Sequence, residues 1–157
     1  GPDLFSEGST HANPFFQFIG SMIAAPSQAD LACHAPKAVL LTQGKTSPYP
    51  WSPDVLPLSL HKIGQLGILA VPAELTIMSG RRLMKTVESV LPAQLDYTVV
   101  AGLSNAYSGY VTTKEEYDLQ HYEGGSTHFG PWTLAAYQQS FYQLRLPYQK
   151  GSQHDYL

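Results

Sequence analysis

A single carboxylate and a nearby tyrosine stand where a sheet could bring them together. Glu74 follows closely after the apolar run Gln65–Val71, and the segment Ser104–Tyr110 follows a second apolar run, Tyr97–Ala101. Ligands of α/β sheets bind outside the carboxyl ends of the strands. Both segments should therefore open on the same edge, where a carboxylate could meet a tyrosine hydroxyl. Spacing alone still favours the plainer interpretation, in which Glu74 is a solvated loop residue.

The chain has ten tyrosines, and four of them lie close together in the sequence, at Tyr107, Tyr110, Tyr117 and Tyr122. Phenol hydroxyls can bind, orient or donate protons, so this segment is a candidate for chemistry. The alternative is amphipathic packing, with the rings inside and the hydroxyls at the rim.

Other motifs are weaker. Gly102–Ala106 follows a predicted strand and has the pattern Gly-x-Ser-x-Ala, close to a nucleophile elbow centred on Ser104, but a simple turn is the stronger interpretation. His121–Glu123 matches the His-x-Glu half of a zinc deaminase, but the chain has one cysteine, Cys33, so the cysteine half is missing. The six histidines are scattered, and none forms an i, i+4 pair, which favours surface or hydrogen-bonded roles. Arg81 and Arg82, at the start of a predicted helix, suggest a paired or anion-binding role, and the alternative is simple exposure.

The elements that must position these residues centre on a predicted βαβ unit. Gln65–Val71 reads as a buried strand, Gly80–Val90 as an amphipathic helix with Ser79 as its N-cap, and Tyr97–Ala101 as a second buried strand. The spacing is that of a right-handed crossover. The sequence therefore predicts an α/β fold: a mixed sheet with at least one βαβ unit and flanking helices, forming a partial domain.

The segments on either side of this unit also have patterns that predict structure. These patterns are helical spacing of apolar residues, short apolar runs, proline-rich stretches and a Thr-x-x-Glu capping box. They predict a helix over 14–25, a strand over Ala38–Leu41, an extended loop over 43–58, a short helix from Thr113 to about Glu123 that the glycine pair 124–125 stops, and a last helix from Gly130 to Pro147.

Composition excludes several classes of protein. Hydrophobic residues make up 43% of the 157 residues, which excludes a disordered chain, and the net charge of −3 gives no footprint for nucleic acid. One cysteine excludes an internal disulfide. Charged residues are only 13%, which predicts an exposed apolar face, either on the helix with Phe15 and Phe16 or beside Ala38–Leu41.

Long strings of this sequence resemble the neutral ceramidase family. They share the order and composition of that family's motifs and cover about residues 8–143. The strings are Ala70–Leu83, Ala101–Thr113, Glu115–Tyr117, Gln120–Thr127 and Phe129–Pro131, with Asn13–Phe15 and Cys33–Lys37 earlier in the chain.

The resemblance implies a zinc-dependent amidohydrolase that cleaves the N-acyl bond of ceramide into a sphingoid base and a fatty acid. By motif, Glu74 and Tyr110 match two ligands of Zn²⁺, and Tyr122 matches an active-site tyrosine that hydrogen-bonds the amide oxygen. Ala73 and Leu75 depart from the Gly-Glu-Phe that the family more often has around this glutamate. The family's two zinc histidines match nothing here and are expected upstream.

The resemblance also implies where the chain stands in a larger protein. Residues 1–146 are expected to be the C-terminal part of the catalytic domain, with 147–157 a loose tail and the family's immunoglobulin-like domain absent. The expected partners are ceramide and the rest of the catalytic domain, with room for peripheral membrane contact, and the family implies a secreted or membrane-associated protein. The chain alone is expected to be inactive. The alternative is a truncated, non-catalytic ceramidase-like protein that acts by association only.

Overall fold

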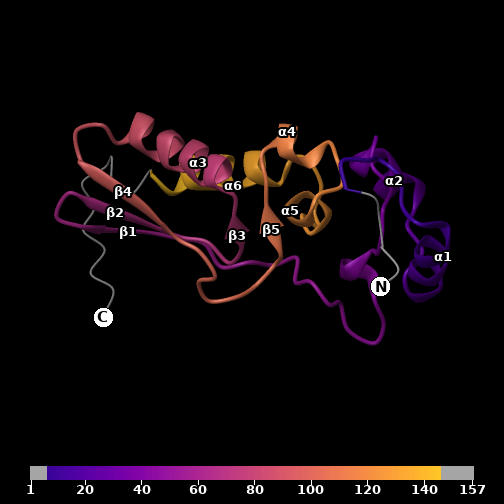
Figure 1. Cartoon of the computed structure of the whole chain (residues 1–157). Helices are drawn as coiled ribbons and strands as arrows, with labels where there is room; N and C mark the ends of the chain where they lie inside the picture. Colours follow the sequence, from indigo (N-terminus) through magenta and orange to yellow (C-terminus); the bar gives the residue numbers. More distant parts are fainter. Residues whose placement is uncertain (1–6, 146–157) are drawn as a thin grey trace.

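A βαβ crossover organises one end of the molecule. The structure is a computed structural model of the chain and describes residues 7–145. Strands β1 (Ser59–Ile63), β2 (Leu66–Ala70) and β4 (Tyr97–Ala101) form a sheet in the order β1-β2-β4, antiparallel between β1 and β2 and parallel between β2 and β4. Helix α3 (Ile77–Val90) connects the two parallel strands. The predicted βαβ unit and mixed α/β fold are confirmed (Figure 1).

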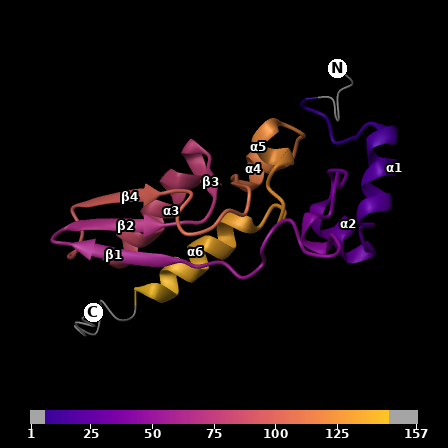
Figure 2. The ribbon, with the colours of Figure 1, turned by 90° about the horizontal axis from the view of Figure 1, so that it is seen from below.

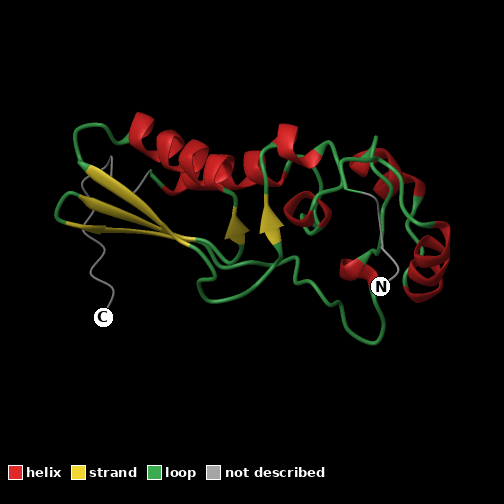
Figure 3. Cartoon of the chain, in the orientation of Figure 1, coloured by secondary structure: helices red, strands yellow, loops and turns green. Residues whose placement is uncertain are grey.

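Two short strands follow the two parallel strands of this unit, one after each. Strand β3 (Glu74–Leu75) comes just after β2, and strand β5 (Tyr110–Val111) comes after β4. They pair in parallel as a separate two-stranded sheet, with Glu74 opposite Tyr110. Figure 3 shows this pair beside the end of the larger sheet, near the middle of the molecule. The chain therefore carries Glu74 and the tyrosine segment to one place, as the sequence predicts.

Helices α3 and α6 (Thr133–Leu144) cover one side of the larger sheet, as Figures 1 and 2 show. The core between them is apolar and continuous, and α6 contributes Leu134, Tyr137 and Phe141 to it. Its largest fully buried side chain is Phe141, and Leu69, Leu83, Val87 and Val111 are also fully buried. Burying a side chain of this size contributes about 1.5–3 kcal/mol.

The N-terminal segment packs at the opposite end of the molecule from the sheet (Figure 1). Helix α1 (Pro14–Ile23) begins after Asn13, whose side chain accepts a hydrogen bond from the amide of Phe15 at 3.0 Å, and α2 (Gln28–His34) begins with a capping box. A short 3₁₀ turn, η1 (Gln43–Lys45), is the one regular element that the described structure has within the predicted loop 43–58. One face of α1 exposes apolar side chains, which confirms the expected apolar surface. These are Phe15, Phe18, Ile19, Met22 and Ile23.

The predicted strand over Ala38–Leu41 is wrong. This segment runs against α1 and not beside a sheet strand, and the carbonyl oxygen of Leu40 packs so closely on Gly20 that a Cβ there would clash with it. The amide of Ala38 bonds the carbonyl of Thr10 at 3.0 Å. A short apolar run indicates burial but does not distinguish a strand from a segment packed on a helix.

Several element bounds differ from prediction, among them the start of α6 at Thr133 and not at Gly130. Helix α3 begins at Ile77, because Thr76 and not Ser79 is its N-cap, and Ser79 is buried inside the first turn. The helix after the capping box ends at once, as α4 (Lys114–Tyr117), and the glycine pair ends a separate short helix, α5 (Tyr122–Gly125).

Strand β4 pairs only with β2 among the described strands, and it is not fully buried, because alternate side chains lie on the face of the sheet away from α3 and α6. Its Tyr97 is 73% exposed and Val99 is 44% exposed. The prediction that Tyr97–Ala101 is a buried strand is therefore wrong about its burial, because an apolar composition alone does not show that a strand is covered. Within residues 7–145, no helix is both long and apolar enough to span a bilayer. The predicted tail 147–157 and the end of the last helix at Pro147 lie outside the described residues.

Candidate functional site

Glu74 and three phenols converge where β3 and β5 pair. The hydroxyl of Tyr107 donates a hydrogen bond to Oε1 of Glu74 at 2.9 Å. Tyr110 lies opposite Glu74 in the strand register, and the same carboxylate influences the pKa of its phenol. The rings of Tyr110 and Tyr122 meet edge to face, with centroids 5.8 Å apart and planes at 84°. We call these four residues the carboxylate–phenol cluster.

The local backbone sets this arrangement. The amide of Glu74 donates to the carbonyl of Gly109 at 3.0 Å, and the amide of Tyr110 donates to the carbonyl of Ser126 at 3.0 Å. Gly109 has φ of +86°, a left-handed conformation that L residues rarely adopt. It also packs tightly, since a Cβ at this position would lie 2.7 Å from the Ser126 oxygen. Glycine is therefore required directly before Tyr110.

Electrostatics in the cluster favour neutral phenols beside a carboxylate. The hydrogen bond to Glu74, partial desolvation and the negative charge of Glu74 raise the pKa of Tyr110 to about 12. Desolvation and the same carboxylate raise the pKa of Tyr107. A neighbouring cation would act in the opposite direction, because it stabilises the phenolate. The cluster therefore holds proton donors as it stands, and its phenols would become stronger ligands beside a cation.

The cluster is open to its surroundings. Tyr122 is 69% exposed and Tyr107 is 49% exposed. Glu74 also borders an open hollow of about 690 Å³, whose walls include the apolar side chains of Leu75, Ile77 and Leu103. A partner or substrate can therefore approach the hydroxyls directly.

The other sequence candidates have structural roles. The Ser104 hydroxyl donates to the carbonyl of Ala101 at 2.8 Å, as a turn residue does, and no helix begins directly after it, so the nucleophile elbow is not formed. Arg82 pairs with Glu115 at 2.8 Å. His34, His61 and His128 each have a side-chain hydroxyl partner, as the hydrogen-bonded interpretation predicts, whereas His154 lies outside the described residues.

The described residues contain no complete metal-ligand set. Between residues 7 and 145, no three His, Cys, Asp or Glu side chains converge as a metal site would require. The cluster offers one carboxylate, which is an ordinary zinc ligand, whereas a catalytic zinc usually has three protein ligands, drawn from histidine, cysteine and carboxylate side chains. A phenol oxygen binds a cation well only as the phenolate, which a nearby dication favours.

Comparison with known proteins gives the family. The model of the neutral/alkaline non-lysosomal ceramidase N-terminal region matches residues 1–139. The chain belongs to this family. It is 48% identical to neutral ceramidase A of Dictyostelium discoideum over 99% of the chain and 22% of that protein. It is also 45% identical to the neutral ceramidase of Pseudomonas aeruginosa, over 92% of the chain and 21% of that protein.

Solved ceramidase structures agree in fold. The crystal structure of neutral ceramidase from Pseudomonas aeruginosa superposes with a TM-score of 0.77 at 40% identity, covering 92% of this chain and 24% of that one. A ceramidase complexed with C2 superposes with a TM-score of 0.76 at 43% identity, covering 88% of this chain and 22% of that one. The chain thus spans about a fifth to a quarter of the ceramidases that it matches.

The sequence predicted the partners of this cluster with one omission. Glu74, Tyr110 and Tyr122 are brought together as expected, although the structure leaves their chemical roles as proposals. The sequence names Tyr107 only as one of four neighbouring tyrosines and gives it no role, yet its hydroxyl donates a hydrogen bond to Glu74. Its place in the segment after β4, where a hydroxyl was expected to meet Glu74, was the available signal.

Proposed function

We propose that this chain is a segment of a neutral ceramidase, a zinc-dependent amidohydrolase that cleaves the N-acyl bond of ceramide into sphingosine and a fatty acid. The observation that carries the proposal is the carboxylate–phenol cluster. Its members come from three family-like strings that are separate in sequence, and they converge around Glu74. The apolar wall of the adjoining hollow suits a lipid substrate.

The residues take distinct roles in this proposal. Glu74 and Tyr110 are two protein ligands of the metal, and two histidines elsewhere in the full-length protein complete the set. Bound zinc supplies a Lewis acid that lowers the pKa of a coordinated water to about 7. Tyr107 holds Oε1 of Glu74 and so fixes the orientation of that carboxylate. Tyr122 is accessible and donates a hydrogen bond to the amide oxygen as negative charge develops there.

Two variants of the full-length protein test these roles. Glu74→Ala removes an anionic ligand, so bound zinc and ceramide hydrolysis should be lost together. Tyr122→Phe removes only a hydroxyl, so zinc content should stay unchanged while kcat falls about 10²- to 10³-fold, the cost of one oxyanion donor. Metal content by atomic emission and turnover of a fluorescent ceramide measure the two effects. Full activity of the Phe variant would exclude Tyr122 from the mechanism, and normal zinc in the Ala variant would exclude Glu74 as a ligand.

The proposal extends to partners and location. We propose that the rest of the catalytic domain covers the exposed face of α1, because five apolar side chains on one helix are costly to leave in water. The full-length protein would act on ceramide outside the cell or at a membrane surface. Exposed α1 residues should become protected from hydrogen exchange and from oxidation of Met22 in the full-length protein, relative to the isolated chain. Equal protection in both would overturn this assignment.

A further inference from the structure

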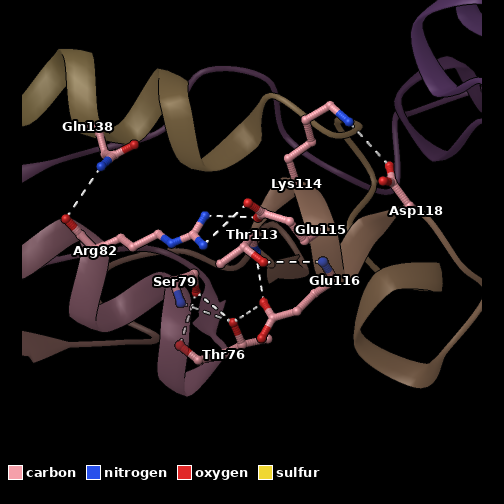
Figure 4. Close-up of polar contacts among 9 residues, drawn as sticks. All are labelled: Thr76, Ser79, Arg82, Thr113, Lys114, Glu115, Glu116, Asp118 and Gln138. Atoms are coloured by element: carbon pink, nitrogen blue, oxygen red, sulfur yellow. Dashed lines mark hydrogen bonds and ion pairs between the residues drawn. The ribbon is translucent and has the colours of Figure 1, made fainter.

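One carboxylate joins the segments that follow β3 and β5. Oε2 of Glu116 accepts hydrogen bonds from the Thr76 hydroxyl at 2.7 Å and from the Thr113 amide at 2.8 Å. The Thr113 hydroxyl in turn accepts the amide of Glu116 at 3.2 Å, which completes the capping box of α4. Figure 4 shows Glu116 between the two threonines. A capping box normally serves its own helix, whereas Glu116 also binds the N-cap residue of α3.

The two threonines stand directly after the strands of the cluster. Thr76 follows β3, which carries Glu74, and Thr113 follows shortly after β5, which carries Tyr110. A second link runs in parallel, because the carbonyl of Val111 accepts both the Thr76 amide at 3.1 Å and the Ser79 hydroxyl at 2.6 Å. The polar groups thus form one connection between the start of α3 and the end of β5.

This connection joins buried hydroxyl side chains to a charged, half-buried carboxylate. Thr76 is 9% exposed, Thr113 is 2% exposed and Ser79 is fully buried. Although partial burial alone would raise it, the pKa of Glu116 is lowered by the Thr113 amide and the Thr76 hydroxyl. Hydrogen bonds to an ionised acceptor are stronger than neutral ones, and low exposure protects them from competition by water.

We propose that Glu116 is a positioning residue for the carboxylate–phenol cluster: by holding Thr76 and Thr113 together, it fixes the spacing of Glu74 and Tyr110. The inference rests on the proposed function only for what the cluster does. Outer partners that orient metal ligands commonly change metal affinity 10- to 100-fold when removed. Glu116 does not contact Glu74 or Tyr110 in this way but acts on them through the backbone, because it binds Thr76 and Thr113.

Shortening Glu116 separates its two roles. In α2, Asp30 already completes a capping box with Ser27, so an aspartate at this helix position can serve its own helix. Glu116→Asp should therefore keep α4 capped while its carboxylate, one methylene shorter, loses Thr76. The matched control is Glu115→Gln. Glu115 also links α4 to α3, through Arg82 at 2.8 Å, but this ion pair is exposed and exposed pairs contribute little.

The first measurement uses this chain without metal. In β3, the Glu74 amide bonds Gly109, and just after it the Thr76 amide bonds Val111. Glu116→Asp should speed hydrogen exchange at these two amides at least 10-fold and leave amides of the β2–β4 pair unchanged, whereas Glu115→Gln should change neither group. Unchanged exchange in Glu116→Asp, or an equal effect of Glu115→Gln, would overturn the proposal.

The second measurement uses the full-length protein and a zinc chelator in competition. Glu116→Asp should weaken zinc binding about 10-fold or more, and Glu115→Gln should keep it within about twofold. Faster exchange with unaltered zinc affinity would also overturn the proposal, because the strands would then move without moving the ligands. If the unsubstituted protein bound no zinc, the proposed function would fail, while the exchange result would still decide whether Glu116 holds the strands together.

Discussion

Gly109 offers the sharpest test of how the backbone builds the cluster. Gly109→Ala places a Cβ 2.7 Å from the carbonyl oxygen of Ser126 and 2.8 Å from Nδ1 of His128, at a residue with φ of +86°. The left-handed conformation costs an L residue roughly 1–2 kcal/mol. The Ser126 oxygen must also move, although it accepts the Tyr110 amide, and a lost hydrogen bond costs about 1 kcal/mol. The free energy of unfolding should therefore fall by about 3 kcal/mol.

Urea unfolding followed by tryptophan fluorescence measures this change in the isolated chain. Gly44→Ala is the control, because Gly44 lies in the 3₁₀ turn and a Cβ there meets nothing within 4 Å. The control should stay within about 0.5 kcal/mol of the unsubstituted chain. Combining Gly109→Ala with His128→Ala should recover part of the loss, since one of the two close contacts is then removed. A loss below about 0.5 kcal/mol for Gly109→Ala would refute the argument from conformation and contact.

Two further predictions concern burial. Lys37 is 5% exposed, and desolvation lowers its pKa to about 8. Between about pH 8 and 10.5 the unfolded chain therefore binds more protons than the folded chain, so the free energy of unfolding should rise with pH in that window. Relative to Lys37→Met, the unsubstituted chain should gain on the order of 2 kcal/mol in unfolding free energy from pH 7 to pH 10, and parallel pH profiles would contradict the assignment. Phe141 is fully buried, so Phe141→Ala should cost about 3–5 kcal/mol. The exposed neighbour Gln139→Ala should change stability by less than about 0.5 kcal/mol in the same melts, and an equal loss in both would show that burial is not the cause.

Sequence reasoning predicted elements well where several signals agreed. The strand Tyr97–Ala101 has the expected bounds, and the capping box at Thr113 starts a helix as expected, because a cap and its hydrogen bonds are local. The strand expected over Ala38–Leu41 is wrong, because apolar composition does not specify which neighbour buries a segment.

In the candidate site too, part of the arrangement could be predicted from the sequence and part depends on the tertiary structure. The approach of Glu74 to the tyrosine segment could be predicted, since parallel strands end at the same edge of a sheet. Which phenol would bond Glu74 could not, because the answer depends on the path of the loop through Gly109 and on the pairing of β3 with β5. The sequence predicts that Glu116 caps its own helix but not that it also accepts a hydrogen bond from Thr76, because those two residues are 40 positions apart.

The separate sheet of β3 and β5 has a consequence for how the chain folds. Tyr107 and Glu74 are 33 residues apart in sequence, and α3 and β4 lie between them. Once β2 and β4 have paired, with Ala70 opposite Ala101, the loop still to be closed shrinks from roughly 33 residues to roughly ten, which lowers the entropic cost of closure by about 1 kcal/mol. The cluster should therefore assemble after the crossover unit, so partly folded chains would lack it. Formation of the carboxylate–phenol cluster should therefore be a late step in folding, and it should depend on prior pairing of β2 and β4.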